Sequence, residues 1–184
     1  MLSLEDDIQI LIDGCLKNDR KAQEHLYKRF YKAMMTLCAR YTKDHNDALE
    51  VLNDAFLKIF KQIGQYEAAK ASLYTWMRKI VINTAIDFLR KQQVVHNMEV
   101  LLAEGDDPGI ENEAIQKMNG EELLKMIRQL PATTRLVFNL YAIDGFSHRE
   151  IASLLGISAG TSRWHLSDAR RQLKVIVHLM EMNS

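Results

Sequence analysis

A stretch near the carboxyl end, residues 147–173, has the pattern of two helices joined by a tight turn. Ser147 and Glu150 form a capping-box sequence, which predicts the start of the first helix. Gly156 follows the last apolar residue of that helix, and Ser158 offers an N-cap for the second. This arrangement is typical of a DNA-reading helix-turn-helix, and the alternative is an ordinary helical hairpin with a solvated basic face.

The second helix of this stretch is expected to be basic on its outer side. Its inner stripe should include Leu166 and Leu173, with either Trp164 or His165 completing it near the front. Residues 147–174 together carry five cations and two anions. This surplus favours contact with phosphate.

Charge is segregated along the chain, although 24 basic and 24 acidic residues balance over its 184 residues. Residues 70–91 carry five cations and one anion, which makes a second basic region. Residues 99–122 contain eight acids and one lysine. Two basic blocks separated by an acidic one predict two nucleic-acid contacts joined by a segment that avoids the duplex.

The fold is expected to be all-α, with two small helical domains. Apolar residues recur at helical spacing through the first ninety or so residues, and the chain has only two prolines and few alternating β-branched runs. We predict one domain over residues 1–93 and a second over residues 120–184. Residues 94–119 are predicted to form a flexible acidic linker, because acids, glycine and proline replace the apolar period there.

A fourth helix is expected from about Leu73 to Lys91, with Ser72 as its N-cap. The loop before it contains Tyr66 and Lys70, and an aromatic ring and a cation beside a basic helix suit an unpaired base. The residues predicted on the buried side of the helix are Trp76, Ile80, Val81, Ala85, Phe88 and Leu89.

Several classes of protein are disfavoured. Cys15 and Cys38 lie on apolar helical faces without metal-ligand spacing, which predicts reduced core thiols and neither a disulfide nor a zinc site. No apolar run of about eighteen residues and no secretion-signal pattern are present, so we expect a cytoplasmic protein without membrane insertion. The six histidines are scattered, and no Gly-rich phosphate loop or nucleophile–base pairing is evident, which argues against an enzyme. No cofactor is expected.

Three segments together resemble one protein family. They are DALEVLNDAFLKIF at residues 47–60, SLYTWMRKIVINTAIDFLRK at residues 72–91, and LPATTRLVFNLYAIDGFSHREIASLLGISAGTSRWHLSDARRQLK at residues 130–174. In this order and spacing they are similar to bacterial RNA polymerase sigma factors of the extracytoplasmic function (ECF) type in the sigma-70 family. The resemblance implies a region 2-like domain, a region 4-like domain, and a protein that directs RNA polymerase core enzyme to specific promoters and promotes DNA melting for transcription initiation.

A third helix is expected after residues 42–46, because apolar residues recur at helical spacing from Ala48 to Phe60. The resemblance also implies a docking face for polymerase on this helix. Opposite its apolar stripe this helix has a polar and acidic face that includes a leucine. In the family this face docks on the coiled-coil clamp of the largest polymerase subunit, whereas plain solvation is the alternative. The expected polymerase-binding residues are Asp47, Glu50, Asn53, Asp54 and Leu57.

Two promoter elements are implied as DNA ligands. Family members capture a flipped base of the start-proximal (−10) element in the loop before the fourth helix, and they read the upstream (−35) element with the recognition helix in the major groove. The expected −10 contacts are Tyr66, Lys70, Arg78, Lys79, Asn83 and Arg90. The expected −35 contacts are Thr161, Ser162, Arg163 and His165 at or near base edges, and Arg149, Arg170, Arg171 and Lys174 on the backbone.

Some assignments stay open at this level. Trp76 is expected to pack in the core rather than stack on a base, and the bulky Trp164 departs from the commonest family pattern, which leaves the register of the recognition helix open. The linker is either a soluble tether or, as the family implies, a segment that threads the polymerase channels. Whether an anti-sigma factor masks the two domains is also open.

Other function classes fit the sequence less well. A response-regulator-type transcription factor would need an α/β receiver or a ligand domain before its helix-turn-helix, whereas the first ninety or so residues here are predicted to be helical. A helical interaction protein such as an anti-sigma factor would not need two basic blocks. A free DNA-binding regulator is the main alternative to a sigma factor.

Overall fold

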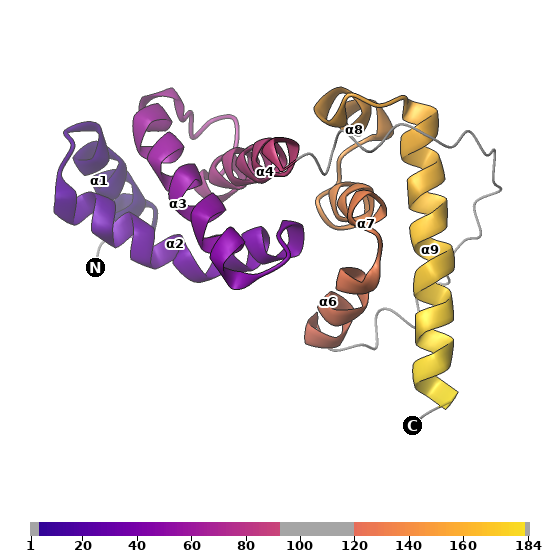
Figure 1. The fold of residues 1–184 in the computed structure, drawn as a ribbon. Helices are drawn as coiled ribbons and strands as arrows, with labels where there is room; N and C mark the ends of the chain where they lie inside the picture. Colours follow the sequence, from indigo (N-terminus) through magenta and orange to yellow (C-terminus); the bar gives the residue numbers. More distant parts are fainter. Residues whose placement is uncertain (1–3, 93–119, 183–184) are drawn as a thin grey trace. The chain divides into compact units, whose positions relative to one another are not determined.

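The computed structural model describes residues 4–92 and 120–182, and every regular element in these ranges is helical (Figure 1). The chain divides into two compact units, Met1–Phe88 and Leu89–Ser184, and the division falls within the last turns of one helix. The expected all-helical fold is therefore confirmed for the described residues. The predicted linker over residues 94–119 lies outside them.

The first unit contains α1 (Leu4–Leu16), α2 (Arg20–Tyr41), α3 (His45–Gln62), the short 3₁₀ helix η1 (Ile63–Gln65) and α4 (Leu73–Lys91). α2 packs against both α1 and α3. At the crossing of α1 and α2, a Cβ atom on Gly14 would lie 2.4 Å from the Cβ atom of Ala22. Only glycine therefore permits this close approach of the two helices.

The core of the first unit follows the predicted apolar stripes. On α3 the buried side chains are Ala48, Val51, Leu52, Ala55, Phe56 and Ile59, at three- and four-residue spacing. Cys15 and Cys38 are buried free thiols, as predicted. Burial raises the pKa of Cys38 to about 12, so this thiol stays protonated and unreactive.

α4 has the predicted bounds, and the backbone N–H of Thr75 donates to Ser72 Oγ at 3.2 Å, which confirms the predicted cap. The predicted buried side was partly wrong. Trp76, Ile80 and Phe88 are only partly buried, because Met77, Ile82 and Ile86 occupy the core instead. The buried residues of α4 are Leu73, Met77, Val81, Ile82, Thr84, Ala85, Ile86 and Leu89.

The second unit contains α6 (Gly120–Gln129), α7 (Ala132–Phe138), the π-helical turn η3 (Asn139–Ile143), α8 (His148–Leu155) and α9 (Ala159–Met182). Pro131 separates α6 from α7. α9 packs against α6, α7 and α8 (Figure 1). The side chains of Leu166, Ala169 and Leu173 are buried. This helix continues beyond Lys174 to Met182.

None of the described helices is both long enough and apolar enough to cross a membrane.

Candidate functional site

Local side-chain chemistry places the two helices of the helix-turn-helix. The Ser147 side chain accepts from the backbone N–H of Glu150, and the Glu150 carboxylate accepts from the backbone N–H of Ser147, so the predicted capping box is complete. Gly156 ends α8 in the left-handed region, at φ 69° and ψ 31°. The backbone N–H of Thr161 then donates to Ser158 Oγ at 2.9 Å and caps α9.

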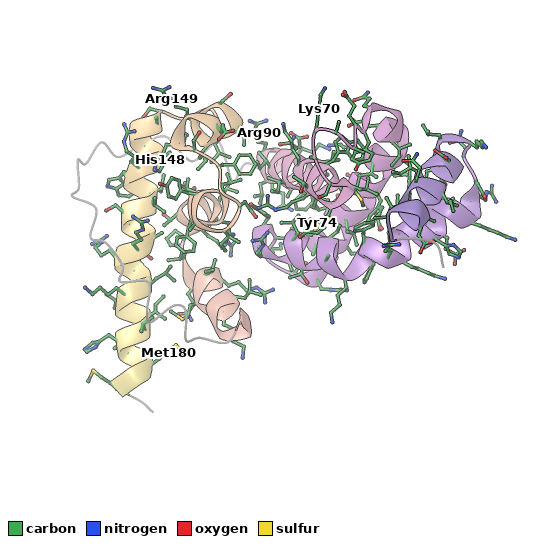
Figure 2. The ribbon with its side chains drawn as sticks, turned by 180° about the vertical axis from the view of Figure 1, so that it is seen from behind. Lys70, Tyr74, Arg90, His148, Arg149 and Met180 are labelled. Carbon is green, nitrogen blue, oxygen red and sulfur yellow. The ribbon has the colours of Figure 1, made fainter. Side chains whose placement is uncertain are left out.

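One face of α9 presents cations to solvent. Arg163, Arg170 and Lys174 are spaced by seven and four residues, which places them on one side of a helix with about 3.6 residues per turn. Arg163 and Lys174 are exposed, and Arg170 is partly exposed. Arg149, the second residue of α8, also extends into solvent (Figure 2). The arrangement suits a duplex whose phosphates and base edges lie along the start of α9.

Arg171 occupies a different environment from these cations. Its guanidinium donates to the Asp168 carboxylate one turn before it, which also accepts from Gln172 Nε2 at 2.7 Å. The Asp168 side chain is almost fully buried, so Arg171 satisfies a buried charge while much of its own side chain stays exposed.

Two predicted base contacts point into the protein. Ser162 is 0% exposed and His165 is 8% exposed, so the prediction that their side chains reach base edges is wrong. Both polar groups are satisfied internally: Ser162 Oγ lies 2.9 Å from His148 Nδ1, and His165 Nδ1 lies 3.1 Å from Thr134 Oγ1. Partners on α8 and α7 therefore hold these side chains on the inner face of α9.

The structure also decides between Trp164 and His165 as the inner residue. His165 is inside, whereas Trp164 is partly exposed on the flank of α9, with the two rings edge-on and their centroids 4.8 Å apart. Burial lowers the pKa of His165, and the nearby Asp168 carboxylate opposes that shift. The imidazole is therefore held mainly in its neutral form.

A second candidate site lies where the loop before α4 meets that helix. The Tyr66 hydroxyl donates to the backbone carbonyl of Ala71 at 3.1 Å, and its ring lies 5.7 Å from the Trp76 ring, centroid to centroid. Lys70 pairs with Glu67 at 2.7 Å, yet it stays largely exposed and extends away from the loop (Figure 2). An aromatic pair and an exposed cation are thus close together in the chain.

The outward face of α4 includes a residue that sequence reasoning assigned to the core. Trp76, Lys79, Asn83 and Arg90 follow one another at three-, four- and seven-residue spacing, so they share one side of the helix. The position of Trp76 three residues before Lys79 was the sequence signal that could have revealed this. Arg78 is half-buried and lies off this face, which separates it from the other predicted contacts.

Tyr74 lies in the first turn of α4 and is 44% exposed (Figure 2). It precedes Trp76 by two residues, so it lies on a different side of the helix from Trp76, Lys79 and Asn83.

The third candidate site is the outer face of α3. Glu50, Asn53 and Asp54 are exposed, and Leu57 is 57% exposed beside them. Asp47 is partly buried at the start of the helix, where its backbone N–H donates to the Asp44 carboxylate at 2.9 Å. This face is therefore polar and acidic, with one exposed apolar side chain in it.

The described ranges contain no group of three or more histidine, cysteine or acidic side chains that could hold a metal ion.

Two family models match the chain. The model for sigma-70 region 2 matches residues 26–94, and the model for sigma-70 region 4 matches residues 120–173. Between them they include α3, α4 and the whole helix-turn-helix.

Individual proteins match over nearly the full chain. The ECF RNA polymerase sigma-E factor of Escherichia coli (strain K12) is 28% identical over 176 residues, covering 90% of this chain and 91% of that protein. The sigma-E factor of Haemophilus influenzae is 27% identical over 179 residues, covering 90% of this chain and 93% of that protein. Among solved structures, the sigma factor RpoE of Bartonella quintana, in complex with the anti-sigma factor NepR, is similar in fold, with 20% identity and a TM-score of 0.51 over 84% of this chain and 96% of that chain.

Proposed function

Because this chain belongs to the sigma-70 family as an ECF sigma factor, a promoter-specific transcription initiation factor, we propose that its two helical units contact two elements of one promoter. The first unit also holds the chain on RNA polymerase core enzyme. Sigma factors are not enzymes in themselves, so RNA synthesis belongs to polymerase. The work of this chain is binding, positioning and duplex opening.

The proposed division of the chain is a region 2-like domain over residues 1–93, a linker over residues 94–119 and a region 4-like domain over residues 120–184. The two family matches, which end at residue 94 and begin at residue 120, support it.

The observation that carries the proposal is the row of cations on α9. Arg163 lies in the first turns of a helix whose start is exposed, and Arg170 and Lys174 continue the same face. In this arrangement Arg163, with Thr161 beside it, reaches base edges of the −35 element in the major groove. Arg170, Lys174, Arg171 and Arg149 lie against the backbone phosphates.

The start-proximal (−10) element is assigned to the loop and outer face of α4. Lys70, Lys79 and Arg90 supply charge for phosphate, and Asn83 supplies an amide for a base edge. The Tyr66 and Trp76 rings offer a stacking surface for a base removed from the duplex. Because extraction of a base costs a few kcal/mol, opening draws on several such contacts and on polymerase itself.

Docking on core enzyme is assigned to the outer face of α3. Glu50, Asn53, Asp54 and Leu57 form its centre, with Asp47 at its edge. The carboxylates suit a basic partner surface, and Leu57 adds apolar surface area that becomes buried on binding.

A regulatory partner is also proposed. The Bartonella quintana sigma factor of similar fold was solved with an anti-sigma factor. We propose that an anti-sigma factor also binds this chain. We further propose that the chain acts in the cytoplasm, where RNA polymerase works.

Reconstitution with bacterial core polymerase tests the proposed function. Core enzyme plus this chain should bind tightly and produce transcripts that neither component produces alone. If the chain binds DNA but never binds core enzyme, the proposal fails and a free DNA-binding regulator replaces it. A chain carrying Glu50→Lys and Asp54→Lys should lose transcription while retaining its helical circular dichroism.

A further inference from the structure

Three side chains from three consecutive elements form a polar column inside the second unit. The ring of Tyr141, in η3, is stacked on the His148 imidazole with centroids 4.4 Å apart and planes 19° apart. On its other side, His148 Nδ1 lies 2.9 Å from Ser162 Oγ. Ser162 is 0% exposed, so the serine end of this hydrogen bond is shielded from water, while His148 is partly exposed.

The two ends of the hydrogen bond lie beside residues assigned to DNA. His148 is the first residue of α8 and precedes Arg149, and Ser162 lies in the first turn of α9 between Thr161 and Arg163 (Figure 2). The bond therefore ties the start of the helix that carries Arg149 to the start of the helix that carries Arg163.

The hydrogen bond adds a directional contact to the packing of α8 against α9. Ile151, Leu155 and Leu166 are buried, and the hydrophobic attraction between such side chains is non-directional. A hydrogen bond depends steeply on distance and angle. The stack on Tyr141 in turn fixes the plane of the imidazole.

We propose that His148 is a positioning residue for promoter recognition. Through Ser162 it sets the rotation of α9 relative to α8, so that Arg163 meets base edges while Arg149 holds the backbone. This inference rests on the proposed function of the helix-turn-helix, and it adds a residue that touches no DNA itself.

Three substitutions and one control separate the hydrogen bond of the imidazole from its stack on Tyr141. Ser162→Ala and His148→Phe both remove the hydrogen bond, and His148→Phe keeps a ring against Tyr141. His148→Asn retains an amide near the position of Nδ1 and so keeps a hydrogen-bonding group. Ser153→Ala, at an exposed serine on α8, is the matched control.

The measurement is the affinity of reconstituted holoenzyme for two duplexes, one with a −35 element that supports transcription and one with that element scrambled. Ser162→Ala and His148→Phe should each lower the preference for the matched duplex about fivefold, with little change on scrambled DNA, because the phosphate contacts remain. Their double variant should lose no more than either single variant. His148→Asn should restore most of the preference, and Ser153→Ala should behave as wild type.

The outcomes distinguish this inference from the proposed function. If wild-type holoenzyme shows no preference for any upstream element, the proposed function itself fails. If wild type discriminates but Ser162→Ala and His148→Phe discriminate equally well, the positioning role is wrong. Equal losses on matched and scrambled DNA, with a lowered melting temperature, would also overturn it, since they would mark the column as purely structural.

Discussion

The Tyr66 and Trp76 rings lie 5.7 Å apart, tilted by 58°, at the junction of the loop and α4. The Tyr66 hydroxyl donates to the backbone carbonyl of Ala71, which fixes the ring relative to the end of the loop before α4. Trp76 is held on the helix beside it and remains partly exposed. The pair forms an aromatic surface, and Trp76 lies on the same side of α4 as Lys79 and Asn83.

Substitution of this surface should slow promoter opening. Base–aromatic stacking is worth about 1–3 kcal/mol per base, so Trp76→Ala should slow formation of the open complex by about fivefold or more. The rate can be followed by the fluorescence of 2-aminopurine placed in the −10 element. A template with a pre-opened bubble should restore the variant, and Tyr74→Ala, off this face, is the control. An equal defect on the pre-opened template would show that Trp76 serves the fold alone.

Charge reversal on α3 should weaken docking. Glu50→Lys with Asp54→Lys replaces two exposed carboxylates on the proposed face and should reduce affinity for core polymerase at least about tenfold. Asp7→Lys with Asp13→Lys makes the same change in net charge on exposed positions of α1, and should leave affinity nearly unchanged. Fluorescence titration of labelled protein with core enzyme measures both. Similar losses in the two double variants would point to a general charge effect instead.

The cations of α9 should separate into two classes. Arg163→Ala should weaken binding to the preferred −35 sequence by about 1–3 kcal/mol and lower the specificity at one base pair. Lys174→Ala should instead weaken binding to all sequences alike, and it should reduce the slope of log affinity against log salt concentration by about 1. Binding isotherms of holoenzyme on matched and mismatched duplexes at several salt concentrations measure both effects. If Arg163→Ala weakened binding to all sequences equally, Arg163 would contact phosphate and not a base edge.

The second unit should lose stability in mild acid. Burial lowers the pKa of His165 in the folded chain, so protonation is easier after unfolding. The contribution of neutral His165 to the stability of the folded unit is fully present at pH values above the ordinary histidine pKa of about 6.5. It is lost as the pH falls below that value toward the lower pKa of His165 in the folded chain.

Trp164 provides the measurement of this effect. In a Trp76→Phe background its fluorescence reports urea unfolding of the second unit alone, and the midpoint should fall as the pH is lowered through about 6. His165→Asn should flatten that dependence. A midpoint that falls equally in wild type and His165→Asn would assign the effect to other groups.

Features set by neighbouring residues were predictable from the sequence. The capping box at Ser147, the left-handed Gly156 and the cap at Ser158 each depend on residues within one helical turn, and all three are confirmed. The start of α4 followed in the same way from Ser72.

Features set by distant partners were not predictable. Ser162 and His165 are polar, and their inward orientation depends on His148 and Thr134, which lie 14 and 31 residues away in the chain. The predicted burial of Trp76 was wrong for the opposite reason. Its apolar character suggested burial, but Met77 and Ile82 already fill the core side of α4.

Selection from a library of templates with randomised upstream sequence tests the central claim most directly. Core polymerase with this chain should enrich transcribed templates that share two short elements at a nearly constant separation. Arg163→Ala should broaden the sequences selected at the upstream element and leave the start-proximal element unchanged. Trp76→Ala should reduce the amount of transcript without changing the selected upstream sequence. Enrichment of a single element, or of templates with no shared element, would contradict an account in which two units of one chain read two parts of the same promoter.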